Sequence, residues 1–596
     1  MLKEQGPKVL TIDLSSERAD AVRRPDLCHW LGGSGLATAL LGEEIKPEKG
    51  VFSAEQPIIM TIGPMTAIYP VVTKVVAMFR SPLTGGIGES HAGMRLGMAM
   101  RFAGYDGIVI RGKATRPTYL VIDSTGVKFK PAGPLWGTDT EESGRILREQ
   151  EGGRGHRSCM RIGQAGERLI RFAGVNVDTY RHFGRLGLGA VFGSKLLKAV
   201  VIKGDENQSA IANPAKFGKV YSEIYKKVTA TETMEKYHGL GTAGNVLTLN
   251  QIKSLPTRNL QASEFDGAGE ISGEAFAEHN LLRKLACAGC PIGCIHLALY
   301  RRSFGDASQE YEFNQIAYDH ELIYALGALL GLSNRSDILS LILEVERAGL
   351  DAMATGVCLA WATEAMEKGL LSEEDLLGRL SFGDVEGYLK AIRQLVQQKH
   401  PFYQAMAFGT EVLANKYGGR DFALTLAGNE VAGYHTGYAN IAGQAFGARH
   451  SHLDNAGYSF DQEKEKVTIE KLADKIIAEE IERNALSSLC ICFFARKVYD
   501  FKTVVKALNA LDFDWEEQAL KDLGTQIFLQ KRIIKARLGF DPSAIRIPRR
   551  FFQTPSFNGM LEVESLERLM VALRTKTDEL MDKLEAKSRI RQNFQE

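Results

Sequence analysis

The chain has 596 residues, 44% hydrophobic and 24% charged, which are the proportions of an ordinary globular protein. This length exceeds what one hydrophobic core usually supports, so we expect about two to four domains. The formal net charge of +1 gives no electrostatic reason to expect nucleic acid or a membrane surface as partner. No apolar run approaches the roughly 20 residues of a membrane span, and no secretory signal stands at the N-terminus, so we expect a cytoplasmic location.

The first 205 residues are rich in short β-branched runs bounded by turn residues. Such runs indicate strands, and the clearest are Val9–Leu14, Ile58–Ile62, Gly107–Ile110 and Ala199–Ile202. The sequence therefore predicts a β-rich domain at 1–205.

Helical periodicity dominates after a polar stretch at Asn207–Lys216. Apolar residues recur at three- and four-residue spacing in the segments Ser336–Ala348, Val357–Leu370, Val467–Asn484, Trp515–Leu538 and Val563–Leu584. We expect two mainly α-helical domains, at 206–415 and 416–596. The predicted fold class is α+β, with the β-rich domain first and a functional site where the domains meet.

Glycine and cysteine are the residue types whose usage is informative. The 60 glycines fit either a loop-rich protein or close approach of the backbone to a large ligand. Eight cysteines are too few for a disulfide scaffold at this length. Cys28, Cys159 and Cys358 are scattered and read as small buried residues.

The other five cysteines form two tight groups. Cys287, Cys290 and Cys294 lie on a turn rich in Gly and Pro, at spacings of three and four residues. Three such thiolates can hold a cubane iron–sulfur cluster if a fourth comes from elsewhere, and either Cys490 or Cys492 could supply it. The alternative is a structural zinc site, although zinc ribbons usually show two paired Cys-x-x-Cys knuckles.

A series of sequence blocks, together with the cysteine triplet, resembles the tungsten-containing aldehyde:ferredoxin oxidoreductases. The blocks, in chain order, are Trp30–Ala37, Ser81–Gly85, Phe102–Asp106, Ile162–Glu167 and Arg181–Ala190. A dinucleotide fingerprint is the alternative for the last block, but a strand-like run follows the glycines closely where a helix would be required. The resemblance covers nearly the whole chain.

The resemblance implies a tungsten or molybdenum bis-pyranopterin, a 4Fe-4S cluster and magnesium. By the same resemblance, the second domain holds the cysteine triplet and the third holds the fourth cluster ligand, which in the family's register is Cys492. Lys74 would lie between cluster and pterin, and main-chain carbonyls of His91 and His182 would hold the magnesium. The phosphate-binding segments would include Gly93, Arg181, His182, Gly184 and Arg185, and paired hydrogen bonds from arginine suit phosphate.

Two later segments match the family's pterin-binding motifs. The first, in the second domain, contains Glu346, Gly349, Leu350 and Asp351. The second, in the third domain, contains Ser487 and Ile491, with serine where the family has an acid. The resemblance also assigns active-site roles to Glu312 and His452, which we expect to close one pocket from different domains. The residue-level alternatives are a solvated Glu312 and a metal site formed by His450 and His452.

The implied reaction is oxidation of an aldehyde to a carboxylic acid, or the reverse, with electrons passing to ferredoxin or a partner subunit. Some family dimers share an iron, but Ser340 and Leu343 stand at the ligand positions, so any homodimer should lack it. One alternative is a subunit of a larger complex that reduces an aromatic acyl-CoA thioester. The other is a zinc-stabilised protein without catalytic activity.

Overall fold

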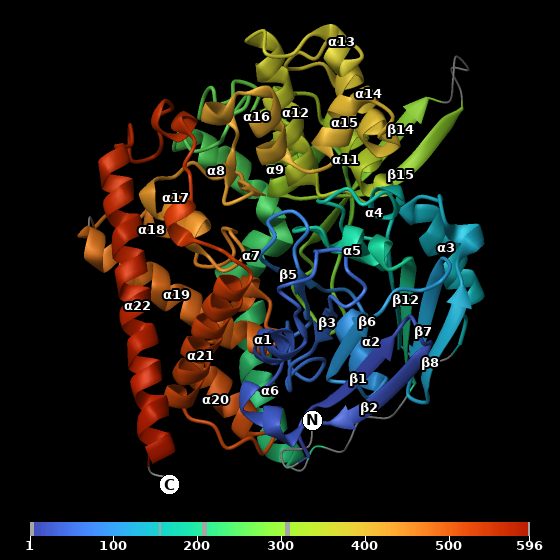
Figure 1. Ribbon diagram of the computed structural model, residues 1–596, viewed down its shortest axis with the longest axis vertical. Helices are drawn as coiled ribbons and strands as arrows, with labels where there is room; N and C mark the ends of the chain where they lie inside the picture. Colours follow the sequence, from blue (N-terminus) through green and yellow to red (C-terminus); the bar gives the residue numbers. More distant parts are fainter. Residues whose placement is uncertain are drawn as a thin grey trace.

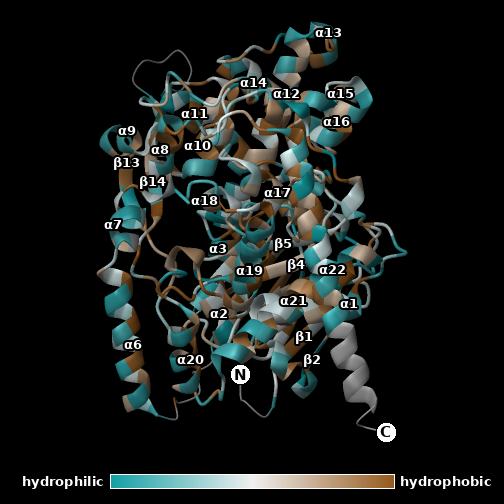
Figure 2. Cartoon of the chain, turned by 90° about the vertical axis from the view of Figure 1, so that its left-hand side faces the viewer, coloured by the Kyte–Doolittle hydropathy of each residue, from teal (hydrophilic) through white to brown (hydrophobic). Residues whose placement is uncertain are grey.

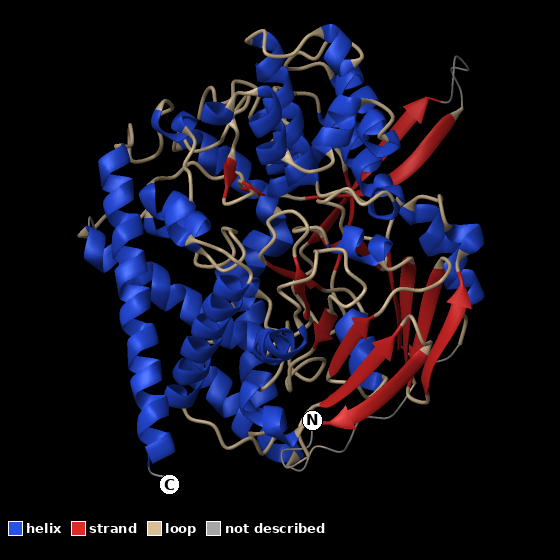
Figure 3. Ribbon diagram, viewed as in Figure 1, coloured by secondary structure: helices blue, strands red, loops and turns tan. Residues whose placement is uncertain are grey.

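The computed structural model of the chain describes residues 5–153, 156–205, 211, 213–303, 310–465 and 467–593. Strands concentrate in the first third of the chain and helices in the remainder (Figures 1 and 3). The predicted fold class is confirmed in this respect. The second region departs from it by including a three-stranded sheet.

Two six-stranded sheets form the β-rich region. The first has the order β2-β1-β6-β3-β4-β5 and the second the order β11-β10-β9-β12-β7-β8. Only the pairs β1–β6 and β12–β7 are parallel. The strands are β1 (Lys8–Asp13), β2 (Arg18–Arg23), β3 (Ile58–Thr61), β4 (Val75–Arg80), β5 (Ile87–Ala92), β6 (Gly107–Arg111), β7 (Thr118–Asp123), β8 (Gly126–Pro131), β9 (His156–Arg161), β10 (Val175–Val177), β11 (Arg181–Phe183) and β12 (Leu197–Gly204).

Side-chain alternation explains why these sheets stack. On β3, Ile58 and Met60 join a core shared with Leu120 and Ile122 of β7, while Ile59 faces the other way. Because successive side chains of a strand point to opposite faces, each inner strand can serve two cores. The first sheet is therefore covered by the second sheet on one face. Its other face is covered by α1 (Gly33–Glu44), on which α19 (Ile469–Ser488) and α21 (Glu517–Arg537) pack.

The middle region combines helices with the third sheet, which has the order β13-β14-β15. The strands are β13 (Leu281–Leu285), β14 (Ile295–Ser303) and β15 (Tyr311–Tyr318), and β14 and β15 form a hairpin that projects from the body in Figure 1. The helices of this part of the chain include α6 (Pro214–Thr229), α7 (Glu232–Gly239), α10 (His320–Leu326), α11 (Arg335–Ala348), α12 (Ala352–Glu367), α14 (Val385–Gln397) and α16 (Thr410–Tyr417). A short hairpin follows them, formed by β16 (Thr425–Leu426) and β17 (Asn429–Glu430).

Two long helices of the last region, α19 and α21, pack on α1 and so bring the chain back to the first sheet. The other helices of this region include α17 (Tyr438–Phe446), α20 (Phe501–Asn509) and α22 (Val563–Asn593). Helix α19 packs against α1, α21 and α22, so its C-terminal end lies beside the β-rich region. Among the described residues no single helix has the length and hydropathy of a membrane span, and only the bent pair His320–Leu330 and Arg335–Ala348 passes that test jointly.

Candidate functional site

Four cysteine thiols from two distant segments lie together. Cys287, Cys290 and Cys294 occupy the loop between β13 and β14, and Cys492 follows the end of α19. The pKa of the Cys290 thiol is raised to about 12, mainly by burial and also by the thiols of the other three cysteines. The pKa of Cys294 is also raised by burial, with Cys492 and Cys287 among its electrostatic neighbours. The triplet is thus brought to a cysteine about 200 positions later in the chain.

A segment of the first domain holds the two cysteine loops in place. The N–H of Val71 donates to the carbonyl of Gly289 at 3.2 Å, and the carbonyl of Val71 accepts from the N–H of Cys492 at 3.2 Å. The N–H of Lys74 donates to the carbonyl of Cys490, also at 3.2 Å. Main-chain hydrogen bonds of this kind fix the backbones of both loops without using their side chains.

Cys490 and Cys492 point to different surroundings. The thiol of Cys490 donates to the carbonyl of Thr61 at 4.0 Å, inside the core below β3. Burial raises its pKa to about 12, and its other polar neighbours are Thr66 and the N–H of Gly63. No cysteine is among the groups that shift the pKa of Cys490, whereas Cys492 shifts that of Cys290. The geometry therefore brings Cys492, and not Cys490, to the triplet.

Two half-buried cations face the thiols. Burial lowers the pKa of Lys74, but the thiols of Cys492 and Cys287 outweigh it and the net shift is upward. Burial also lowers the pKa of Arg181, but the thiols of Cys294 and Cys287 outweigh it and the net shift is upward. Desolvated cations are costly unless anions offset them. Asp319 acts on Arg181 in this way, and the placement of both half-buried cations fits a further negative charge held by the thiolates.

Glycine at position 93 is required sterically. A Cβ there would lie 2.6 Å from the Sγ of Cys287 and 3.5 Å from the Nζ of Lys74. Real Cβ atoms do not approach sulfur so closely. The observed role of Gly93 is to let the backbone pass close to the cysteine site. Gly184, by contrast, has room, since its Cβ would meet only the Cβ of His182 at 3.8 Å.

The strands that carry the two histidines predicted to hold magnesium lie in contact. His91 is on β5 and His182 on β11, and these strands pack against each other. The Nε2 of His91 lies 2.8 Å from Glu89, and that of His182 lies 2.5 Å from Glu346. The second pair links the predicted phosphate-binding segment directly to the first predicted pterin motif. Ionic contact therefore joins two segments that are 164 positions apart.

The first predicted pterin motif forms the junction between α11 and α12. Gly349 closes α11 in the left-handed region (φ +76°), where glycine is favoured. Asp351 caps α12 by accepting from the N–H of Met353 at 2.9 Å, and it also accepts from the Nε of Arg185 at 3.0 Å. Leu350, between them, pairs with Ala173 in a β-bridge. The motif is thus tied to the block that contains Arg185.

Arg185 also reaches a buried acid that we did not expect from the sequence. Its Nη2 donates to the side chain of Asn429 at 2.9 Å and to the carbonyl of Glu430 at 2.8 Å. Burial raises the pKa of Glu430. The Nη1 of Arg185 and the Oε2 of Glu430 are buried without a hydrogen-bond partner among the described residues. Unsatisfied buried polar groups of this kind fit a polar ligand such as a pterin with its phosphates.

The second predicted pterin motif packs on the glycine block of the first domain. A Cβ at Gly33 would lie 2.0 Å from the carbonyl oxygen of Ser487, and the N–H of Gly35 donates to the hydroxyl of Ser488 at 3.1 Å. Ile491 is buried. These glycines permit close approach of two protein backbones. The glycines of this block are therefore explained neither by a loop-rich fold nor by close approach to a ligand, because the backbone that they approach belongs to the protein itself.

His452 lies beside a glutamate, but that glutamate is Glu321. The Nε2 of His452 is 3.2 Å from the Oε1 of Glu321, which begins α10. Burial raises the pKa of Glu321 to about 7, and the charge of Asp319 adds to the shift. Burial lowers the pKa of His452 well below its usual range, and Arg185 lowers it further. The pair therefore combines a neutral imidazole with a carboxyl group that titrates near neutrality.

Aromatic rings border this pair. The ring of Tyr434 lies 5.2 Å from that of His452, and Tyr458 lies at 6.1 Å. The Nδ1 of His452 is buried and has no hydrogen-bond partner among the described residues. The arrangement offers one free ring nitrogen and one protonatable carboxyl group in an apolar surrounding, which suits proton transfer.

Glu312 contacts other side chains than this pair, and the predicted pocket between Glu312 and His452 stays a prediction. Glu312 is on β15 of the projecting hairpin, where its carboxylate pairs with Arg347 at 2.9 Å and Arg302 at 3.6 Å. The hydrogen bond from Arg347 lowers its pKa. Alternate residues of β15 are buried from Asn314 onward, whereas Glu312 is partly exposed and lies nine positions before Glu321.

A buried ion pair between Glu89 of β5 and Lys531 of α21 was not predicted from the sequence. The Oε2 of Glu89 lies 2.5 Å from the Nζ of Lys531, and its Oε1 accepts from Ser34 at 2.5 Å. Lys531 also donates to Asn484 at 2.7 Å. Lys531 stands on the apolar face of α21, with Ile527 and Ile534, which is the signal that could have revealed it.

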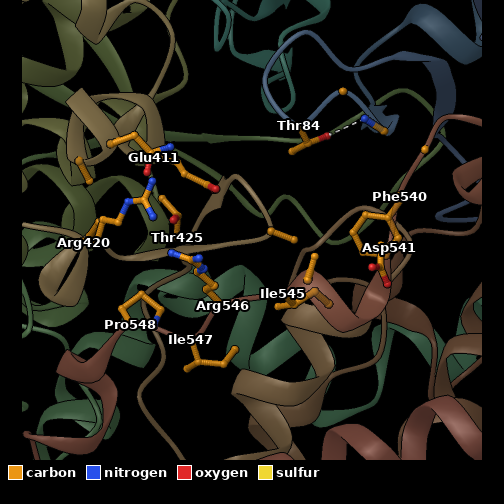
Figure 4. A pocket seen from close by; sticks show the side chains of 18 of the residues that line it. Thr84, Glu411, Arg420, Thr425, Phe540, Asp541, Ile545, Arg546, Ile547 and Pro548 are labelled. Atoms are coloured by element: carbon orange, nitrogen blue, oxygen red, sulfur yellow. Dashed lines mark hydrogen bonds between the residues drawn. The ribbon is translucent and has the colours of Figure 1, made fainter. Parts of the chain in front are cut away.

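The remaining predictions concern assembly and cavities. On α11 the hydroxyl of Ser340 donates to the carbonyl of Asp337 at 2.6 Å, and Leu343 packs against the core. A cavity of about 690 Å³ opens elsewhere, and Figure 4 shows Arg420 and Arg546 directed toward Thr425 within it. The wall of this cavity contains no residue of the candidate site, so we do not assign it to the reaction.

Comparison with known proteins supports the resemblance. Residues 9–204 match the family profile of the aldehyde ferredoxin oxidoreductase N-terminal domain, and residues 219–577 match that of domains 2 and 3. A tungsten-containing aldehyde ferredoxin oxidoreductase of Pyrococcus horikoshii is 30% identical over 575 residues, covering 93% of this chain and 92% of the relative. The WOR-like subunit of an aliphatic sulfonate oxidoreductase of Pyrococcus furiosus is 31% identical, covering 88% and 85%. The solved active site complex BamBC of benzoyl coenzyme A reductase, with 1,5-dienoyl-CoA, has a similar fold (TM-score 0.82, 18% identity, 96% and 94% covered).

Proposed function

Because the chain belongs to the aldehyde ferredoxin oxidoreductase family and is an enzyme of that oxidoreductase class, we propose that it interconverts an aldehyde and a carboxylic acid. The observation that carries the proposal is the Glu321–His452 pair, whose electrostatic neighbour Arg185 forms an ion pair with Asp351 of the first predicted pterin motif. Family members act on small-molecule substrates.

The proposed cofactors follow from the side chains and carbonyl groups that are available as metal ligands. We infer that Cys287, Cys290, Cys294 and Cys492 hold a 4Fe-4S cluster, whose negative charge Lys74 and Arg181 offset. The family implies a tungstopterin, which the two motifs would hold with Arg185, while carbonyls of His91 and His182 would bind magnesium. When bound, the metal–pterin supplies the two-electron redox chemistry and the cluster passes electrons singly to ferredoxin or a partner subunit.

The chain's own contribution is to move protons and to exclude water. Oxidation of an aldehyde with one water releases two protons and two electrons. Ionised Glu321 can accept a proton from the attacking water, because its pKa of about 7 matches neutral conditions. With ionised Glu321 beside its Nε2, the neutral His452 carries its proton on that nitrogen, and its free Nδ1 can accept a hydrogen bond from the attacking water. Tyr434 and Tyr458 border the site and limit entry of bulk water.

An aldehyde panel with an anaerobic viologen-dye assay tests this function. Metal analysis of the same sample should give about four iron atoms per chain together with tungsten or molybdenum. One zinc per chain without iron would instead support the zinc-stabilised protein. Absence of activity with every aldehyde, in protein with full metal content, would contradict the proposed reaction.

A second function is reduction of an aromatic acyl-CoA thioester as a subunit of a larger complex. The fold similarity to the BamBC complex over 96% of this chain favours it. The same dye in its reduced form, offered with an aromatic acyl-CoA, distinguishes the two. Oxidation of the dye by the thioester but not by carboxylic acids would select the second function.

A further inference from the structure

Three cations gather beside the cysteine site. Lys236 is on α7, and Arg496 and Lys497 follow the short helical turn Phe493–Ala495. Partial burial lowers the pKa of Lys236, and the positive charges of Arg496 and Lys497 lower it further. Among the described residues no acid offsets this effect on Lys236. The chain as a whole carries a net charge of only +1, so this concentration is local.

Helix α7 is attached to both cysteine segments. The ring of Tyr237 stacks on that of Phe494, with centroids 4.1 Å apart and an interplanar angle of 8°. Arg496 and the Cys492 thiol both act on the pKa of Tyr237, which burial raises overall. On the other side, the Nδ1 of His238 lies 2.8 Å from the carbonyl of Ile292, inside the triplet loop. The cations are therefore held at a fixed place next to the thiols.

This face is open to solvent. Lys236, Lys497 and Gly289 are exposed, and Cys290 and Cys492 are only half-buried. Figure 2 shows α7 next to β13 and β14 on one flank of the molecule.

Two further features modify the charge of this face. Arg283 on β13 is also exposed and adds a positive charge. The carboxylate of Glu482 lies near Arg496 and offsets part of its charge. Glu232 and Glu235 are exposed on α7 as well, but neither acts on the pKa of Lys236, so Lys236 and Lys497 are the main cationic groups of the face.

We propose that an acidic iron–sulfur electron carrier docks on the face formed by α7, the turn Phe493–Ala495 and the cysteine triplet loop. Clustered like charges cost stability in the free protein and gain it back when an anionic surface covers them. Each encounter transfers one electron from the reduced cluster to the oxidised carrier, with no bond made or broken. The inference rests on the proposed function, since it assumes a cluster held by Cys287, Cys290, Cys294 and Cys492.

The experiment compares three proteins loaded with their metals. They are the wild type, the double variant K236E/K497E and the control K399E/K416E. Lys399 and Lys416 are exposed and lie in the region of α14 and α16, away from the cysteine site. Binding of a strongly acidic bacterial-type ferredoxin is measured at about 20 mM and about 300 mM salt. The distance over which two charges interact before salt screens them differs severalfold between these conditions. Reduction of the same ferredoxin and of a viologen dye is then followed with substrate.

The expected result is loss of binding and of ferredoxin reduction by about tenfold or more in K236E/K497E at low salt, with a smaller loss at high salt. Dye reduction and iron content should equal those of the wild type, and the control should resemble the wild type throughout. Normal ferredoxin binding by K236E/K497E, or an equal loss in the control, overturns the proposal. So does binding of the wild type to anionic phosphatidylglycerol vesicles or heparin in place of ferredoxin. Failure of the proposed function differs, because the wild type would then lack dye reduction.

Discussion

Replacing Glu321 by Gln tests the acid/base assignment most directly. The amide keeps the size of the side chain and can still accept the N–H of Gly433, which lies 3.4 Å from Oε2. It cannot carry a proton. Because positioned acid/base groups contribute roughly 10²–10⁴-fold, turnover should fall at least about 100-fold, equivalent to ~2.7 kcal/mol of barrier. Iron and tungsten or molybdenum content should stay unchanged.

The pH dependence gives an independent check. If ionised Glu321 accepts the proton, wild-type kcat/KM for the aldehyde should rise to a plateau above about pH 7, the pKa of this carboxyl group. Glu321→Gln should lose this limb of the profile. The control is Glu312→Gln, which removes an ion pair at the edge of the molecule and should leave turnover within about twofold, since exposed pairs contribute only about 0–1 kcal/mol to stability.

The same carboxyl group should weaken the fold at neutral pH. Its folded pKa of about 7 exceeds the ordinary value of 4.5, so the folded state binds more protons between these values. Stability therefore falls as pH rises through this window, by up to about 3 kcal/mol, and stays constant below it. Glu321→Gln should raise the unfolding temperature relative to the wild type at pH 8 but not at pH 4. The assignment fails if Glu321→Gln turns over normally while Glu312→Gln does not.

Further expectations concern the metal site, assembly and the core. Cys492→Ser should lower iron well below about four per chain, whereas Cys490→Ser should leave iron unchanged; the opposite pattern in metal analysis would refute the geometry of this loop. Any homodimer should survive a chelator in size-exclusion chromatography, and an iron between two copies of α11 would disprove this. Lys531→Met should destabilise the protein by about 3–5 kcal/mol in denaturant unfolding by stranding buried Glu89. Adding Glu89→Gln should restore most of the loss, and no restoration would show that the pair is not coupled.

The sequence alone was sufficient for features that depend on local pattern. Short β-branched runs bounded by turn residues predicted β3 and β6. Helical periodicity predicted α11 and α19, because burial of one face of a helix imposes a period on the chain. The cysteine triplet and the ordered blocks indicated the family, which the comparisons confirm. These signals lie within short segments, so no knowledge of folding was needed to read them.

The tertiary structure decided which distant side chains meet. Glu312 and Glu321 are both acids downstream of the triplet, and only the length of the β14–β15 hairpin determines that the second enters the core beside His452. The left-handed backbone at Cys490 (φ 60°) turns its thiol away and leaves Cys492 toward the triplet. Lys531 meets Glu89 across 442 positions. Such contacts depend on how whole helices and strands pack together, and a local sequence pattern does not contain that information.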